Sequence, residues 1–210
     1  PNDQAFDERR YFAEGVEAFV VDVAGIKVGI TICEDIWHKE PADAAAKLGA
    51  EFLINLNASP FHRGKHKERW QVLAQRATEQ NIPMVYVNQV GGQDELVFDG
   101  GSFAVNANGE LAMVAPDFEE GTYELSVSRT VRGVEIDQGI AASALSDTAA
   151  VWQALVLGVR DYVEKNGFPG VVLGLSGGID SAVTLAVAVD ALGADRVQAV
   201  MMPFKYTADM

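Results

Sequence analysis

The stretch Val-Val-Leu-Gly-Leu-Ser-Gly-Gly-Ile-Asp-Ser, residues 171–181, decides how the C-terminal part of the chain folds. Its apolar start predicts a short buried strand, and the adjacent Gly177 and Gly178 predict a tight turn. The apolar run over residues 182–192 predicts a helix. A strand, a turn and a helix in this order gather unpaired backbone N–H groups at the positive end of a helix dipole, so they predict an anion site.

The side chains of this turn favour phosphate as the anion. Glycine lacks Cβ, so a phosphate can approach the backbone closely, and Ser176 and Ser181 add hydroxyl donors. Asp180 repels phosphate unless a cation lies between them, and Mg²⁺ is commonly held by one or two carboxylates plus phosphate oxygens. We therefore expect Asp180 to lie near Mg²⁺. For Ser-Gly-Gly alone, an ordinary capped turn is an equally good interpretation.

The full string carries more information than its glycines. It lacks the Gly-Lys-Ser/Thr end of a Walker A loop. SGGIDS, residues 176–181, resembles the SGGxDS signature of the PP-loop ATP pyrophosphatases, and residues 174–193 with 200–210 resemble the NAD synthetase family in particular. This resemblance implies a doubly wound parallel-sheet domain, similar to the adenine nucleotide alpha hydrolases. The ATP-binding residues that it implies are Gly174, Leu175, Ser176, Gly177, Gly178, Ile179, Asp180 and Ser181.

Length and composition exclude several classes of protein. The 210 residues allow one large or two small domains, and 49% hydrophobic with 22% charged residues is ordinary for a globular protein. The net charge of −14 argues against nonspecific nucleic-acid binding and against anionic membranes as partners. No apolar run reaches about 18 residues, and the polar N-terminus does not resemble a signal peptide. We expect a cytoplasmic protein with small-molecule substrates.

The single cysteine, Cys33, follows an apolar strand predicted over residues 26–32. One cysteine excludes an intramolecular disulfide and a cysteine-rich zinc site. A thiol at the end of a buried strand is well placed as a nucleophile, with the backbone N–H of Glu34 as an oxyanion donor. A small buried hydrophobe is an equally good interpretation of these residues alone. The three histidines show no metal-ligand spacing, and we expect them to be solvated.

Three segments at and after Cys33 resemble the nitrilase (carbon–nitrogen hydrolase) family. They read GITICEDIW over 29–37, NLNASPFHRGKHKER over 55–69, and PMVYVNQVGGQDELVFDGGSF over 83–103. The resemblance implies a nitrilase-like α-β-β-α sandwich and makes Cys33 the catalytic nucleophile. It also implies that Ser59 and Lys65 contact a glutamine substrate, with Asp3 as a further candidate.

The sequence departs from this family in one respect. The family's cysteine works with a glutamate that accepts a proton and a lysine that stabilises the tetrahedral intermediate, and both precede the cysteine. The lysine comes just before a loop that resembles the first residues of this chain, so we expect a fragment that lacks both partners. Glu34 and Asp35 are not expected to replace them, nor is Lys27 in the strand. We therefore expect the chain alone to be inactive.

A loss of periodicity between two patterned regions predicts a domain boundary. Strands and helices alternate first and hairpins follow, which suits a layered α/β sandwich. We predict the C-terminal part of a nitrilase-like glutaminase domain over 1–132 and a linker over 133–148. Helical spacing from residue 149 then opens the N-terminal part of a NAD synthetase ATP-binding domain, 149–210.

The two motifs together resemble the glutamine-dependent NAD synthetases. This implies hydrolysis of glutamine at Cys33 and use of the ammonia, with ATP and Mg²⁺, to amidate nicotinic acid adenine dinucleotide to NAD, releasing AMP and pyrophosphate. We also expect a homo-oligomer. Two alternatives remain open. One is an inactive fragment with an assembly or interaction role, and the other is a stand-alone nitrilase-type amidase, which has no use for the phosphate turn.

Overall fold

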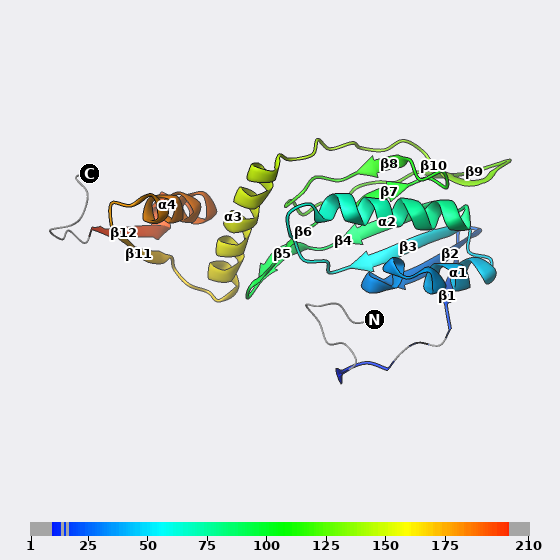
Figure 1. Cartoon of the computed structure of the whole chain (residues 1–210), viewed down its shortest axis with the longest axis horizontal. Helices are drawn as coiled ribbons and strands as arrows, with labels where there is room; N and C mark the ends of the chain where they lie inside the picture. The colour runs from blue at the N-terminus through cyan, green and yellow to red at the C-terminus, as the bar shows by residue number, and fades with distance from the viewer. Residues whose placement is uncertain (1–9, 14, 16, 202–210) are drawn as a thin grey trace.

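The computed structural model describes residues 10–13, 15 and 17–201. Asp3, one of the predicted glutamine contacts, lies outside this part of the chain. Figure 1 shows a larger part that contains β1 to β10 and a smaller part that contains β11, α4 and β12, with α3 (Asp147–Lys165) between them. Within the described residues, no helix is both long and apolar enough to cross a membrane.

A six-stranded sheet forms the larger part, in the order β1-β2-β3-β4-β7-β8. β2, β3 and β4 are parallel, and the other neighbours are antiparallel. β1 and β2 form one antiparallel hairpin, and β7 and β8 form another. The strands are β1 (Phe19–Val23), β2 (Ile26–Ile32), β3 (Phe52–Asn57), β4 (Met84–Asn88), β7 (Phe103–Val105) and β8 (Leu111–Val114).

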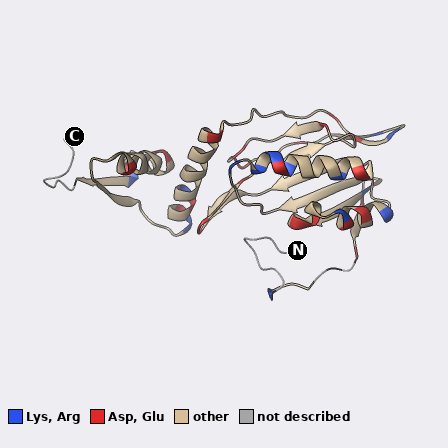
Figure 2. Cartoon of the chain, in the orientation of Figure 1, with Lys and Arg blue, Asp and Glu red and all other residues tan. Residues whose placement is uncertain are grey.

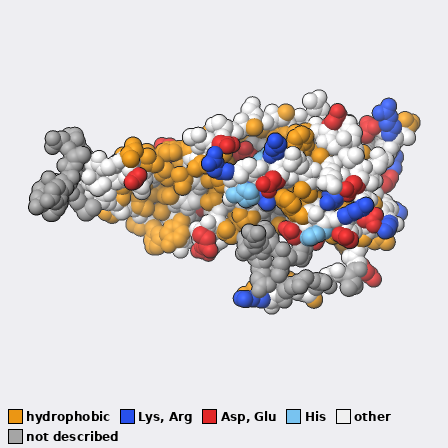
Figure 3. Space-filling model, viewed as in Figure 1, with side chains coloured by type: hydrophobic (Ala, Val, Ile, Leu, Met, Phe, Trp, Pro, Cys, Tyr) orange, Lys and Arg blue, Asp and Glu red, His pale blue; other side chains and the backbone are white. Residues whose placement is uncertain are grey.

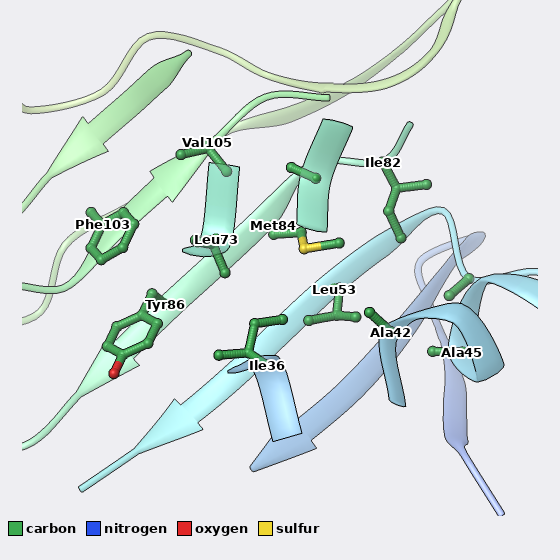
Figure 4. Packing of buried hydrophobic residues seen from close by; sticks show 12 residues of the cluster. Ile36, Ala42, Ala45, Leu53, Leu73, Ile82, Met84, Tyr86, Phe103 and Val105 are labelled. Atoms are coloured by element: carbon green, nitrogen blue, oxygen red, sulfur yellow. The ribbon is translucent and has the colours of Figure 1, made fainter. Parts of the chain in front are cut away.

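Both helices of this part pack on one face of the sheet. α1 (Lys39–Lys47) and α2 (Lys65–Gln80) return the chain between parallel strands, and a 3₁₀ helix, η2 (Cys33–Trp37), precedes α1. Apolar residues four positions apart, such as Leu73 and Ala77, turn one side of α2 to the sheet. Figure 4 shows Leu73 of α2 meeting side chains of the strands in one core. Figure 2 shows charged residues on the helices and almost none on the central strands.

The opposite face of the sheet is covered by a ribbon of β9 (Val127–Thr130) and β10 (Gly133–Ile136). β10 falls within residues 133–148, which we predicted as linker. The difference has a physical reason, because Val134 and Ile136 alternate with polar neighbours and bury their side chains against the sheet. The rest of that range up to α3 has no helix or named strand, although Ala141 forms a bridge with Val114 of β8.

The smaller part contains the predicted strand, turn and helix. β11 (Val171–Leu175) pairs in parallel with β12 (Val197–Met201), and α4 (Ile179–Leu192) and η3 (Ala194–Arg196) connect them. α4 packs on α3 through a small apolar cluster. Figure 3 shows apolar side chains gathered over this part, and Val172 and Val200 of the two strands are exposed. Parallel sheets are normally buried on both faces, so the exposure of Val172 and Val200 is unusual for parallel strands.

The two parts also meet at a hairpin of β5 (Val90–Gln93) and β6 (Leu96–Asp99), which packs on α3. The Gly92 N–H donates to Asp161 Oδ2 (2.7 Å), and Lys165 Nζ donates to the Gly92 carbonyl oxygen (2.7 Å). A Cβ on Gly92 would lie 3.1 Å from Gly158 Cα. Glycine therefore allows the close approach of hairpin and helix.

Candidate active site

The site around Cys33 lies where the three parallel strands end. Parallel strands end at the same edge of a sheet, and ligands of open α/β sheets bind at the carboxyl ends of the strands. The register pairs Ile32 with Leu56 and Asn57 with Asn88. Cys33 is therefore brought to the same edge as the polar residues that end β3 and β4.

Cys33 is half-buried, makes no disulfide and begins η2 in a left-handed conformation, with φ = +47°. This conformation costs a non-glycine residue about 1–2 kcal/mol. Asp35 helps to hold the turn, because its Oδ2 accepts a hydrogen bond from the Ile32 N–H (2.9 Å). The predicted position of the thiol, at the end of a strand and the start of a turn, agrees with the structure.

A buried amide on β3 holds the same turn from the other side. Asn55 Nδ2 donates to Thr31 Oγ1 (3.0 Å) and to the Cys33 carbonyl oxygen (3.4 Å). Asn57, two residues on, donates through Nδ2 to the Asn55 carbonyl (2.8 Å) and the Val87 carbonyl (3.1 Å). These bonds tie the end of β3 to the turn on one side and to β4 on the other.

Ser59 is buried and lies in a polar network beyond β3. Its Oγ accepts from Arg69 Nε (3.2 Å), and its N–H donates to Asn88 Oδ1 (2.9 Å). Arg69 Nη1 also contacts both carboxylate oxygens of Asp99, at 2.9 and 2.8 Å. A hydroxyl that accepts one bond still has its proton to donate. Arg69 therefore fixes Ser59 in a way that leaves this proton for another acceptor.

Lys65, the first residue of α2, lies beside η2. Its Nζ is 4.3 Å from the centroid of the Trp37 ring and 3.3 Å from Glu68 Oε2. Only 20% of the side chain is exposed. A cation over an indole ring is attracted by the ring quadrupole, so Lys65 is held near the turn that Cys33 begins.

Tyr86, on β4, is a further buried residue near the Cys33 site. It pairs in register with Asn55, and its buried hydroxyl lies near Ser59. Burial raises the pKa of Tyr86 to about 12 and outweighs the opposing effects of the Arg69 charge and the nearby Ser59. The hydroxyl is therefore protonated at neutral pH.

His66 differs from the expectation that the histidines are solvated. Its Nε2 lies 3.2 Å from Asp117 Oδ1, and the hydrogen bond with Asp117 raises the pKa of His66 against the effect of burial. Both residues line a cavity of about 480 Å³ between α2 and residues 142–150, together with Trp70 and Leu145. Cys33 does not line this cavity.

The phosphate turn links β11 to α4. The eight residues predicted to bind ATP lie together there, at the end of β11 and in the first turn of α4. Ser181 Oγ donates to the Gly178 carbonyl (2.9 Å) and lies 3.2 Å from Ser176 Oγ. Gly177 has φ = +80°. Gly178 caps α4 without a side-chain acceptor, so no side chain occupies the capping position.

Asp180 is exposed in the first turn of α4. The part of the chain that the structure describes contains no group of three or more His, Cys, Asp or Glu residues that could hold a metal ion. A single carboxylate fits a Mg²⁺ ion that takes most of its remaining ligands from phosphate and water, not a protein cage. The phosphate turn and Cys33 are not brought together, because α3 lies between their two parts (Figure 1).

Sequence reasoning missed the buried polar residues of the Cys33 site, namely Asn55, Asn88, Arg69 and Asp99. One signal could have found Asn55. It alternates with Asn57 in an otherwise apolar strand, and such buried amides need specific partners. No comparable signal links Arg69 to Asp99, which lies 30 residues away.

The family model of carbon–nitrogen hydrolases matches residues 1–136. The chain belongs to this family. A second model, that of NAD synthases, matches residues 151–210. The predicted fold class, a nitrilase-like α/β sandwich followed by the start of a PP-loop domain, is thereby confirmed.

Relatives cover both parts of this carbon–nitrogen hydrolase chain. It is 49% identical to the glutamine-dependent NAD(+) synthetase of Acinetobacter baylyi and 48% identical to that of Xylella fastidiosa, over 100% of its own length and 38% and 39% of theirs. The solved glutamine-dependent NAD+ synthetase of Acinetobacter baumannii, in complex with ADP, matches 99% of the chain at 50% identity with a TM-score of 0.93. This chain covers 39% of that structure. The predicted resemblance is confirmed, and the chain spans under two fifths of these relatives.

Proposed function

We propose that this chain contributes the glutaminase nucleophile and the first part of the ATP site of a glutamine-dependent NAD synthetase. The observation that supports this most directly is the presence in one chain of a strained Cys33 turn and an SGGIDS turn, each at the end of a parallel strand. The named relatives support the same assignment. We also propose that the domains divide within residues 133–148 and that the protein acts in the cytoplasm as a homo-oligomer on small molecules.

At the first site, Cys33 Sγ attacks the amide carbon of glutamine as a thiolate. The tetrahedral intermediate collapses with cleavage of the C–N bond, the amide nitrogen takes a proton and leaves as ammonia, and water hydrolyses the thioester to glutamate. Asp35 is a poor proton acceptor for this step, because its carboxylate already binds the Ile32 N–H. Lys27 is unsuitable as well, since it lies near the start of β2 whereas Cys33 follows its end.

Ser59 and Lys65 are proposed to hold the glutamine, with Asp3 as a third contact from outside the described residues. The Lys65 ammonium suits the α-carboxylate, and the Ser59 hydroxyl has a proton to donate. At the second site, residues 174–181 bind the phosphates of ATP, and Mg²⁺ near Asp180 would neutralise phosphate charge. The nicotinate carboxylate is adenylated with loss of pyrophosphate, and ammonia then displaces AMP.

The first site is tested by labelling with an electrophilic glutamine analogue, on the natural protein that contains this chain. We expect one analogue per chain at Cys33, protection by glutamine, and no label in Cys33→Ala. Ser59→Ala and Lys65→Met should lower the labelling rate by about tenfold, since each removes one contact of roughly 1.4 kcal/mol. An unlabelled Cys33 would instead favour the inactive assembly role.

The second site is tested by ATP–Mg²⁺ binding. We expect Asp180→Ala to weaken binding strongly and Asp195→Ala, an equal change of charge in η3, to leave it nearly unchanged. Absence of any ATP binding by the unaltered protein, with Cys33 still labelled, would favour the stand-alone amidase.

A further inference from the structure

Asn55 is a fully buried amide beside the turn that carries Cys33. Its neighbours Leu53, Ile54 and Leu56 are apolar, so its own polar group needs a specific explanation. Burying an amide is unfavourable unless its hydrogen bonds are replaced. Both Nδ2 hydrogens are used, one on Thr31 Oγ1 and one on the Cys33 carbonyl.

The chemistry of these partners fixes the orientation of the amide. The Cys33 carbonyl oxygen can only accept a hydrogen bond, so the NH₂ end of Asn55 must face it. This leaves Oδ1 on the other side, buried and without a hydrogen-bond partner among the described residues. An unpaired buried acceptor costs about 1–3 kcal/mol. If the position only had to be filled, an apolar side chain of similar volume would avoid that cost.

The amide holds a residue whose backbone is strained. Cys33 has φ = +47°, and such strain persists only where the surroundings impose it. On one side of Cys33, Asp35 holds the Ile32 N–H; on the other, Asn55 holds the Cys33 carbonyl. Side chains from two different elements therefore hold the peptide group that follows Cys33 and the peptide group that precedes Ile32.

We propose that Asn55 is a positioning residue for the nucleophile: it holds the Cys33 carbonyl so that the left-handed turn presents Sγ in one direction. This inference rests on the proposed role of Cys33 in glutamine hydrolysis. Asn55 is fully buried and contacts the turn, so we expect it to act on the rate of attack more than on substrate binding. A misplaced nucleophile lowers the rate of reaction even when the substrate binds normally.

The test compares three variants of the natural protein that contains this chain. Asn55→Ala removes the donor, and Asn55→Asp keeps the volume but brings a carboxylate near the thiol. Asn57→Ala is the matched control, because Asn57 is an amide of the same strand whose side chain, within the described part of the chain, bonds only the Asn55 and Val87 carbonyls. Glutaminase kcat and KM are measured with the pH profile of Cys33 alkylation by iodoacetamide and the thermal midpoint.

We expect Asn55→Ala to lower kcat by about 100-fold with KM changed less than threefold. Asn55→Asp should move the alkylation profile to higher pH, because a nearby carboxylate raises a thiol pKa. Asn57→Ala should lower the thermal midpoint and leave the alkylation profile in place.

Two results would overturn the inference in distinguishable ways. If both Asn55 variants keep the kcat and the alkylation profile of the unaltered protein, Asn55 has only a structural role. If the unaltered protein neither hydrolyses glutamine nor reacts with the glutamine analogue at Cys33, the proposed function fails first, and the positioning role fails with it.

Discussion

The Cys33 site and the phosphate turn are both built at the end of a parallel strand, but they are held together differently. Around Cys33 several bonds join residues 22 to 30 positions apart and are buried or part-buried, as between Asn55 and Cys33 or Arg69 and Asp99, although the Ile32–Asp35 bond is local and exposed. In the phosphate turn they join residues two to five apart and are exposed, as between Ser181 and Gly178. The first site depends on the assembled sheet, whereas the second is largely a local motif.

The largest effect on stability is expected from Arg69→Met. It leaves Asp99 buried and without its cationic partner, which destabilises proteins by about 3–5 kcal/mol. Urea denaturation measures this change. Replacing Asp99 with Leu in the same chain should recover part of the loss, because no unpaired charge then remains buried.

A matched control uses the same substitution on the surface. Arg129 pairs with Glu51, and both side chains are more exposed than Arg69 and Asp99. Solvent screens such pairs, so Arg129→Met should change stability far less. Equal effects at Arg69 and Arg129 would contradict the view that the Cys33 site depends on buried pairs.

A smaller effect is expected from Gly92→Ala, where the hairpin contacts α3. The added methyl group would lie 3.1 Å from Gly158 Cα and 3.2 Å from Asp161 Cβ, so hairpin and helix must separate. Overpacking of this kind costs about 1–3 kcal/mol. The thermal midpoint measures it, and Gln93→Ala at the next, exposed position serves as the control. A midpoint that does not change would show that the contact between the two parts is loose.

The same contrast explains what the sequence could predict. The β1–β2 hairpin, the β11–α4 turn and Cys33 at a strand end follow from local patterns, because their partners are close in the chain. The bond from Asn55 to Cys33 depends on β3 lying beside β2 in one register, and that of Arg69 to Asp99 depends on where the β5–β6 hairpin folds back. Local residue propensities predict neither the register of β3 beside β2 nor the position of the β5–β6 hairpin. β10 was missed because a four-residue strand within a polar segment gives a weak periodic signal.

A pH-dependent effect is expected from His66, which the Asp117 carboxylate faces, with Asp99 and Arg69 nearby. Because the pKa of folded His66 is raised above 6.5, the protonated form stabilises the fold. This stabilisation is fully present below pH 6.5 and is lost as the pH rises through the raised value. His66→Gln should therefore lower the thermal midpoint more at pH 5.5 than at pH 8.5. An equal change at both pH values would contradict this pairing.

The smallest effect on stability is expected from Ser181→Ala in the phosphate turn. Its hydroxyl bonds are exposed, so water replaces them, and the change should stay within about 0.5 kcal/mol. Ser146→Ala provides the comparison, because Ser146 Oγ caps α3 by accepting from the Ala149 N–H, and loss of such a cap costs about 1 kcal/mol.

ATP binding should rank the two variants in the opposite order, with Ser181→Ala the weaker binder and Ser146→Ala unchanged. The Ser146 side chain caps the start of α3, whereas the start of α4 has no side-chain cap and is expected to be stabilised by a bound phosphate. A Ser181→Ala protein that binds ATP normally but unfolds more easily than Ser146→Ala would reverse that assignment.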